Sequence, residues 1–131
     1  MGFCAVPNMA DPPFARPSDI VLDLPAPLSV NRTRRIDWAS KRRLAQWQRS
    51  ADYAYLLKKQ ELNLRPITGR FEIIITLRDG SRIDADNTAK HVIDSLRRFR
   101  LIPDDNPKHM RRVTIEFGDV EGCRATIRPM P

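Results

Sequence analysis

The chain has 131 residues, 41% of them hydrophobic, with a formal charge of +7 and an isoelectric point near 10.1. This length supports one domain with a single core and excludes a two-domain architecture. The basic excess favours a polyanionic partner such as nucleic acid, with a solvated arginine-rich surface as the alternative.

Cysteine use and hydropathy bear on the cellular compartment. Cys4 and Cys123 are the two cysteines, and they are far apart without the spacing of a metal site. This excludes a disulfide framework and fits a reducing compartment. No apolar run reaches the roughly 18 residues of a membrane span, and the first residues lack the layout of a signal peptide. We therefore expect a cytoplasmic protein with no membrane partner.

The N-terminal half is expected to hold a leader, one strand and one long helix. Residues 1–17 are rich in proline and lack periodicity, which predicts a disordered leader, or a mis-assigned start, before a single domain over residues 18–131. Residues 20–24 predict a short strand that Pro25 ends. A helix is predicted over roughly residues 40–62. Its buried stripe comprises Leu44, Trp47, Ala51, Ala54, Tyr55 and Leu62, which makes the tryptophan a core residue rather than a base-stacking one.

The C-terminal half predicts three strands and a second helix. Residues 71–77 alternate with a partly apolar second face, which indicates a central strand, and Asp79-Gly80 predicts the turn after it. The helix is expected from about residue 86 to residue 99. Residues 113–117 predict another strand, and residues 123–128 predict a returning edge strand. The order β-α-β-α-β-β indicates an α+β fold of two layers, a small mixed sheet with two helices packed on one side.

The second predicted helix is amphipathic in an informative way. At about 100° per residue, Asp86, Lys90 and Asp94 lie within an arc of roughly 80°. The opposite side holds Val92, Ile93, Leu96 and Phe99. One face is therefore expected to pack on the sheet while the other presents acid, lysine and acid.

Further carboxylates flank this helix. Asp84 precedes it, and Asp104 and Asp105 follow in a proline-flanked loop that has to fold back if they are to join the others. Mg²⁺ takes oxygen ligands, and two or three aspartates leave coordination positions for water and phosphate. Lys90 would stabilise developing charge or position the attacking water. The alternatives for Asp86 are helix capping and ordinary i,i+4 pairing.

A resemblance to a known family rests on three segments. They are Asp84-x-Asp86-Asn87-x-x-Lys90-x-x-x-Asp94, Asp104-Asp105 and Leu24-Pro25-x-Pro27-x-Ser29-x-Asn31. In residue type and spacing they resemble the RusA family of Holliday junction resolvases, small bacterial and phage-derived endonucleases, over about residues 20 to 128. The resemblance implies a RusA-like α+β fold and a homodimer with two active sites facing a four-way DNA junction. It also implies symmetric nicking of two strands with Mg²⁺ or Mn²⁺ and no small-molecule cofactor.

The resemblance also implies roles for individual residues. The catalytic set would be Asp84, Asp86, Lys90, Asp104 and Asp105. Asp84, Asp86 and Asp105 would bind the metal, Asp104 would be a nearby essential carboxylate, and Lys90 would be the catalytic lysine.

Two other motif positions are expected to support the site, with Asn87 ordering the loop and Asp94 completing the acidic face. One departure concerns DNA contacts, because residues 78–83 hold only two bases where the resemblance leads us to expect a run of arginines. The expected DNA-binding residues are Arg32, Arg34, Arg35, Arg42, Arg43 and Arg82. A second basic group comprises Arg97, Arg98, Arg100, Arg111 and Arg112. Phosphate contacts of this kind would position DNA without reading its sequence.

The functional hypothesis is a structure-selective endodeoxyribonuclease that resolves Holliday junctions by paired, metal-dependent hydrolysis of phosphodiester bonds. Two alternatives remain open. One is a phage-derived protein that binds junction DNA without cutting it, and the other is a flap or fork nuclease with the same chemistry.

Overall fold

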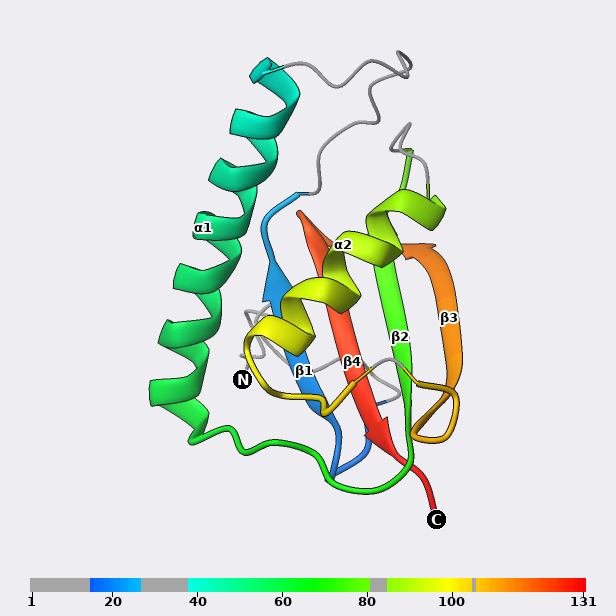
Figure 1. Cartoon of the computed structure of the whole chain (residues 1–131). Coiled ribbons are helices and arrows are strands. Elements are labelled where there is room, and N and C mark those ends of the chain that lie inside the picture. The colour runs from blue at the N-terminus through cyan, green and yellow to red at the C-terminus, as the bar shows by residue number, and fades with distance from the viewer. Residues whose placement is uncertain (1–14, 27–37, 81–84, 105) are drawn as a thin grey trace, which may run out of the picture.

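A computed structural model of the chain describes residues 15–26, 38–80, 85–104 and 106–131, with the backbone alone described at 38–40 and 85–87 (Figure 1). The elements are β1 (Ile20–Leu24), α1 (Trp38–Leu62), β2 (Phe71–Arg78), α2 (Ala85–Arg98), β3 (Met110–Gly118) and β4 (Cys123–Pro129). This is the predicted order. The proposed leader, residues 1–17, lies largely outside the described residues. Within the described ranges, neither helix is long and apolar enough to cross a membrane.

The four strands form one mixed sheet in the order β1-β4-β2-β3. β4 runs antiparallel to both β1 and β2, and β2 runs parallel to β3. The prediction that β2 is central is confirmed. The prediction that residues 123–128 form an edge strand is wrong, since β4 lies between β1 and β2.

The misplacement of β4 has a physical reason. Arg124 and Arg128 make one of its faces look like a solvated edge. In the folded chain, however, Arg124 Nε donates to Asp23 of β1 at 2.7 Å, and Arg128 Nη2 donates to Asp19 at 2.9 Å. The Asp19 side chain is only 1% exposed. These cross-strand pairs neutralise the arginines, and the strand is therefore compatible with the middle of the sheet.

One face of the sheet and both helices build the core. Figure 1 shows α2 lying across the sheet and α1 running along its β1 side. The fully buried residues of β2 are Phe71, Ile73, Ile75 and Leu77. They pack with Trp47, Ala51, Tyr55, Val92, Leu96, Ala125 and Ile127 in one hydrophobic cluster. The predicted two-layer arrangement, with both helices on one side, is thus confirmed.

The long helix follows the predicted stripe except at its end. Trp47 is buried, and its Nε1 donates to the Pro25 carbonyl at 3.2 Å, so it is a core residue as expected. Leu62, expected in the stripe, is 52% exposed. It is the last residue of α1, and the chain turns away at once because Asn63 adopts a left-handed φ of 52° and donates to the Lys59 carbonyl at 2.8 Å.

Contacts between the two helices fix the position of α2. Tyr55 of α1 stacks on Phe99, with ring centroids 4.3 Å apart and an interplanar angle of 2°. Arg98 of α2 donates to Asp52 of α1 at 2.6 Å. The unit β2-α2-β3 has parallel strands, so α2 has to return along the sheet between them. Its first turn therefore lies near the end of β2, and its last turn lies over the β1 side of the sheet, next to α1 (Figure 1).

Candidate functional site

The polar face of α2 is present as predicted in the part whose side chains are described. Lys90 is exposed and Asp94 is half-buried, whereas Val92 and Leu96 on the other side are fully buried. Asp86 lies in the first turn of α2 by its backbone. The side chains of Asp86 and Asn87, and all of Asp84, lie outside the described residues, and their assigned roles stay predictions.

Asp94 is engaged with an arginine of its own helix. Its Oδ1 lies 3.7 Å from Arg97 Nη1, and both side chains are nearly half exposed. Exposed i,i+3 pairs of this kind contribute about 0–1 kcal/mol to folding. The i,i+4 spacing suggested that Asp94 would pair with Lys90, but in the structure it pairs with Arg97, toward the C-terminal end of the helix. This pair lies on the solvent-exposed surface of α2.

Asp104 lies in the loop after α2 and is held by donors. The backbone N–H of Asn106 donates to its Oδ1 at 3.0 Å, and His109 Nδ1 lies 3.3 Å from the same oxygen. The Asn106 hydrogen bond, followed by the His109 side chain, outweighs desolvation and holds the pKa of Asp104 below its usual value. The carboxylate is therefore ionised at neutral pH and still 41% exposed. Asp105 lies outside the described residues.

The described chain does not bring Asp104 to the first turn of α2. The loop containing Asp104 is held at the end of the sheet where β2 and β3 begin. There Phe71 N donates to the His109 carbonyl at 2.9 Å, and Ile67 N donates to the Leu101 carbonyl at 2.8 Å. The helix between them has 14 residues, which corresponds to a length of about 20 Å. Two ligands of one Mg²⁺ ion lie within about 4 Å of each other. The described part of one chain therefore places Asp104 apart from the first turn of α2, where the backbone of Asp86 lies.

This geometry decides how well a metal fits. Carboxylate oxygens are the donors that Mg²⁺ prefers, so the residue types are suitable. Among the described residues, however, no group of three or more His, Cys, Asp or Glu side chains is placed to hold a metal ion. The three predicted metal ligands, Asp84, Asp86 and Asp105, lie outside the residues whose side chains the structure describes, so the metal site stays a prediction.

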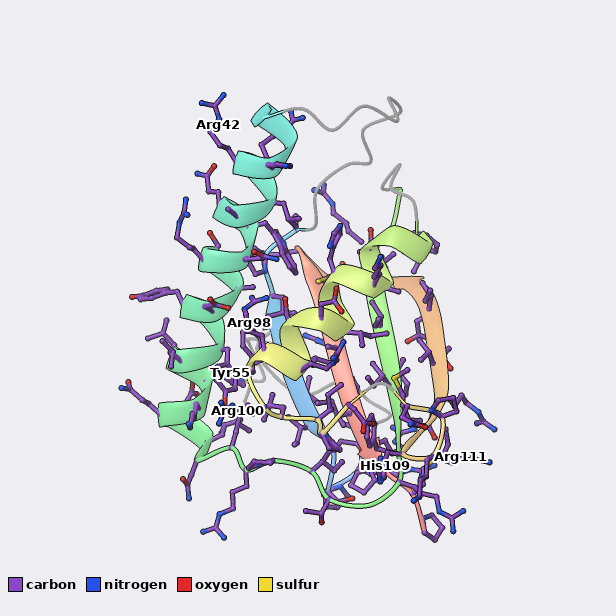
Figure 2. The ribbon with its side chains drawn as sticks, in the orientation of Figure 1. Arg42, Tyr55, Arg98, Arg100, His109 and Arg111 are labelled. Atoms are coloured by element: carbon purple, nitrogen blue, oxygen red, sulfur yellow. The ribbon has the colours of Figure 1, made fainter. Side chains whose placement is uncertain are left out.

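The predicted DNA-binding arginines are only partly described. Arg42 is exposed near the beginning of α1, at the upper end of the molecule in Figure 2, and Arg43 is exposed beside it. Arg32, Arg34, Arg35 and Arg82 lie outside the described residues. In the second basic group, Arg98 is committed to Asp52, while Arg100 and Arg112 are exposed. Arg98 therefore serves helix packing rather than an open basic patch.

In the part of the chain that the structure describes, cavities border the sheet at both ends. The larger, about 950 Å³, is lined by residues 23–26, Arg78 and residues 119–124, in which acids and bases are mixed. Cys123 lines it, and burial raises the pKa of its thiol to about 12, so the thiol is protonated at neutral pH. The smaller cavity, about 420 Å³, is lined by Arg70, Lys108, His109 and Arg111. Sequence reasoning missed this grouping, since only the basic run 108–111 hints at it and Arg70 is distant in the chain.

No model of a known protein family matches this chain, and no curated protein is significantly similar to it.

Proposed function

We propose that the protein is a metal-dependent, structure-selective endodeoxyribonuclease of the RusA type that resolves four-way DNA junctions. The observation that carries the proposal is the spacing of Asp84, Asp86, Lys90, Asp104 and Asp105 around one amphipathic helix. The described fold supports it, because α2 buries its apolar face and leaves Lys90 in solvent beside the position of Asp86. A strongly basic chain with one acidic cluster fits an enzyme that acts on a polyanion.

The separation of the two carboxylate groups favours a site shared by two copies of the chain. Asp84 and Asp86 lie at one end of α2 in sequence and Asp104 and Asp105 follow its other end, and the 14-residue helix between them is about 20 Å long. A two-fold symmetric dimer would bring the first pair of one protomer to the second pair of its partner, and would do so twice. Two equivalent sites are what symmetric nicking of a junction requires.

Each residue would then have a distinct role. The carboxylates of Asp84 and Asp86, with Asp105 contributed by the other copy, would hold Mg²⁺ or Mn²⁺. When bound, the metal supplies a water of lowered pKa and neutralises charge on the phosphate. Lys90 would donate to a phosphate oxygen as negative charge develops there. Asp104, kept ionised by Asn106 and His109, would orient the loop that carries Asp105.

The test is cleavage of a labelled mobile four-way junction, with linear duplex and flap DNA as controls, in Mg²⁺ and in EDTA. We expect paired, Mg²⁺-dependent nicks in opposite arms of the junction alone. Asp86→Asn should abolish these nicks while binding persists, since it removes a ligand and reduces repulsion of phosphate. Unchanged nicking by Asp86→Asn would contradict the assignment. Tight junction binding by the unaltered chain without cleavage would favour a junction-binding protein, and cleavage of flaps alone would favour a flap nuclease.

A further inference from the structure

A cavity lined only by cationic side chains and a histidine lies at the start of β2 and β3. Its volume is about 420 Å³, and its lining residues are Arg70, Lys108, His109 and Arg111. Arg70 directly precedes β2, and the other three surround the first residue of β3. Figure 2 shows His109 and Arg111 together at the lower end of the sheet. Segments 38 positions apart in sequence therefore converge on one hollow of the surface.

The walls of this basic cavity are fixed by hydrogen bonds. Phe71 N donates to the His109 carbonyl at 2.9 Å, which ties the two halves of the lining together. Met130 N donates to the Arg70 carbonyl at 2.9 Å, and Arg111 Nη1 donates to the Pro107 carbonyl at 3.0 Å. The backbone that carries the cations is thus ordered before a ligand arrives, which lowers the entropy cost of binding.

The charges of the cavity are not neutralised by its surroundings. Among the residues that the structure describes, no carboxylate lies within ion-pair distance of Arg70, Lys108 or Arg111. His109 is the exception, because its Nδ1 lies 3.3 Å from Asp104 Oδ1. Its other ring nitrogen, Nε2, is then the one that could contact a ligand. Two guanidinium groups and an ammonium group around one hollow favour an anion with several oxygens, which is the chemistry of phosphate.

We propose that the basic cavity binds a backbone phosphate of the DNA on which the acidic site acts. This inference rests on the proposed function and adds a place where the strand is held. Asp104 contacts the lining residue His109, so the bound phosphate would lie beside the Asp104–Asp105 half of the acidic site. A strand held there would be anchored next to the carboxylates that the partner's helix has to meet. Such an anchor positions DNA and reads no base.

The test compares two double variants that remove the same charge. Arg70→Ala/Arg111→Ala removes two lining guanidinium groups, and Arg16→Ala/Arg65→Ala removes two exposed ones outside the cavity. Binding of a labelled four-way junction is measured by fluorescence anisotropy in EDTA, where no cleavage occurs, across a range of salt concentrations. Far-UV circular dichroism checks that each variant is folded, and Arg70→Lys/Arg111→Lys tests whether charge alone suffices.

We expect the cavity variant to bind the junction about tenfold or more weakly. The slope of log affinity against log salt concentration should fall by about 0.9 for each DNA phosphate that the variant no longer neutralises. The lysine variant should recover most of the affinity, and the control variant should stay within about twofold of the unaltered chain. An affinity and salt slope equal to those of the control variant would overturn the proposal. So would a complete failure of the unaltered chain to bind DNA.

A titration with inorganic phosphate, followed through the ring protons of His109, separates a small-anion site from a DNA contact. Saturation by phosphate combined with unchanged junction affinity in the cavity variant would again overturn it. Failure of the proposed nuclease looks different. The unaltered chain would then bind the junction without cutting it in Mg²⁺, and the cavity would still be judged on binding alone.

Discussion

Mixing two inactive variants should restore nicking if each acidic site is completed between two copies of the chain. The variants are Asp86→Asn, altered at the first turn of α2, and Asp105→Asn, altered in the loop after it. In a mixed dimer, one site receives both substitutions and the other receives neither. Equal amounts that assort at random give about half mixed dimers, so about a quarter of all sites are intact. If both residues served the same site within one chain, every site would carry a substitution and no activity would return.

A supercoiled plasmid with an extruded cruciform gives the readout. Two intact sites linearise it, whereas one intact site leaves an open circle. We therefore expect the mixture to produce open circles at about a quarter of the nicking capacity of the unaltered protein, with little linear product. Each variant alone should produce neither. Subunits are exchanged by unfolding and refolding the variants together.

The matched control is a mixture of Asp84→Asn with Asp86→Asn. Asp84 and Asp86 of one copy contribute to the same shared site. In every dimer, each site therefore carries one of the two substitutions and remains inactive. Restoration in this control would show that the assay reports something other than complementation. Absence of open circles from the Asp86→Asn and Asp105→Asn mixture, with dimers present, would refute the shared site.

Three further predictions concern the fold that carries the site. Leu96→Ala removes a fully buried side chain of α2, and should lower the free energy of unfolding by about 2–5 kcal/mol in urea titrations. Gly122→Ala should cost about 1–3 kcal/mol in the same titrations, because the new Cβ would clash with the Leu24 carbonyl oxygen. A cost under about 0.5 kcal/mol would show that the two backbone segments can separate easily. Burial opposes ionisation of Asp19, but hydrogen bonds, first from Arg128, outweigh it and lower its pKa from 3.8. Because the folded-state pKa is depressed, the stabilisation is present above about pH 4 and lost as pH falls through that pKa. Asp19→Asn should therefore cost about 1–3 kcal/mol at pH 7 and less at pH 3.

The sequence predicts most of the fold because alternation and helical spacing are local signals. The strand at residues 71–77 and the amphipathic helix after it are predicted nearly at the bounds that the structure gives. Strand order is not a local property. Arg124 and Arg128 favour an edge, and only aspartates in and beside β1, about a hundred positions away, make the central place acceptable. The exposure of Leu62 likewise depends on where the helix ends.

Some features of the candidate site likewise follow from local sequence spacing, whereas others depend on contacts between distant segments. The acidic and apolar faces of α2 follow from a period of 3.6 residues, and the buried Val92 and Leu96 confirm that division. The position of Asp104 depends on how the loop after α2 attaches to the start of the sheet, through hydrogen bonds that no spacing predicts. The basic cavity was missed for the same reason, since Arg70 and Arg111 meet only after the two parallel strands have paired.

The separation of the carboxylates has an energetic rationale in the chain by itself. Carboxylates gathered at one place repel one another, and each raises the pKa of its neighbour. Within the described chain, the groups that lower the pKa of Asp104 against desolvation are the Asn106 N–H, the His109 side chain and Arg97. In a single copy, Asp104 is thus stabilised by the donors around it and lies apart from the first turn of α2. Repulsion between the two pairs of carboxylates would arise when two copies meet, where a divalent cation and the cationic side chains would offset it. Association, metal binding and the approach of DNA would then be coupled, and a lone protomer would be unable to nick.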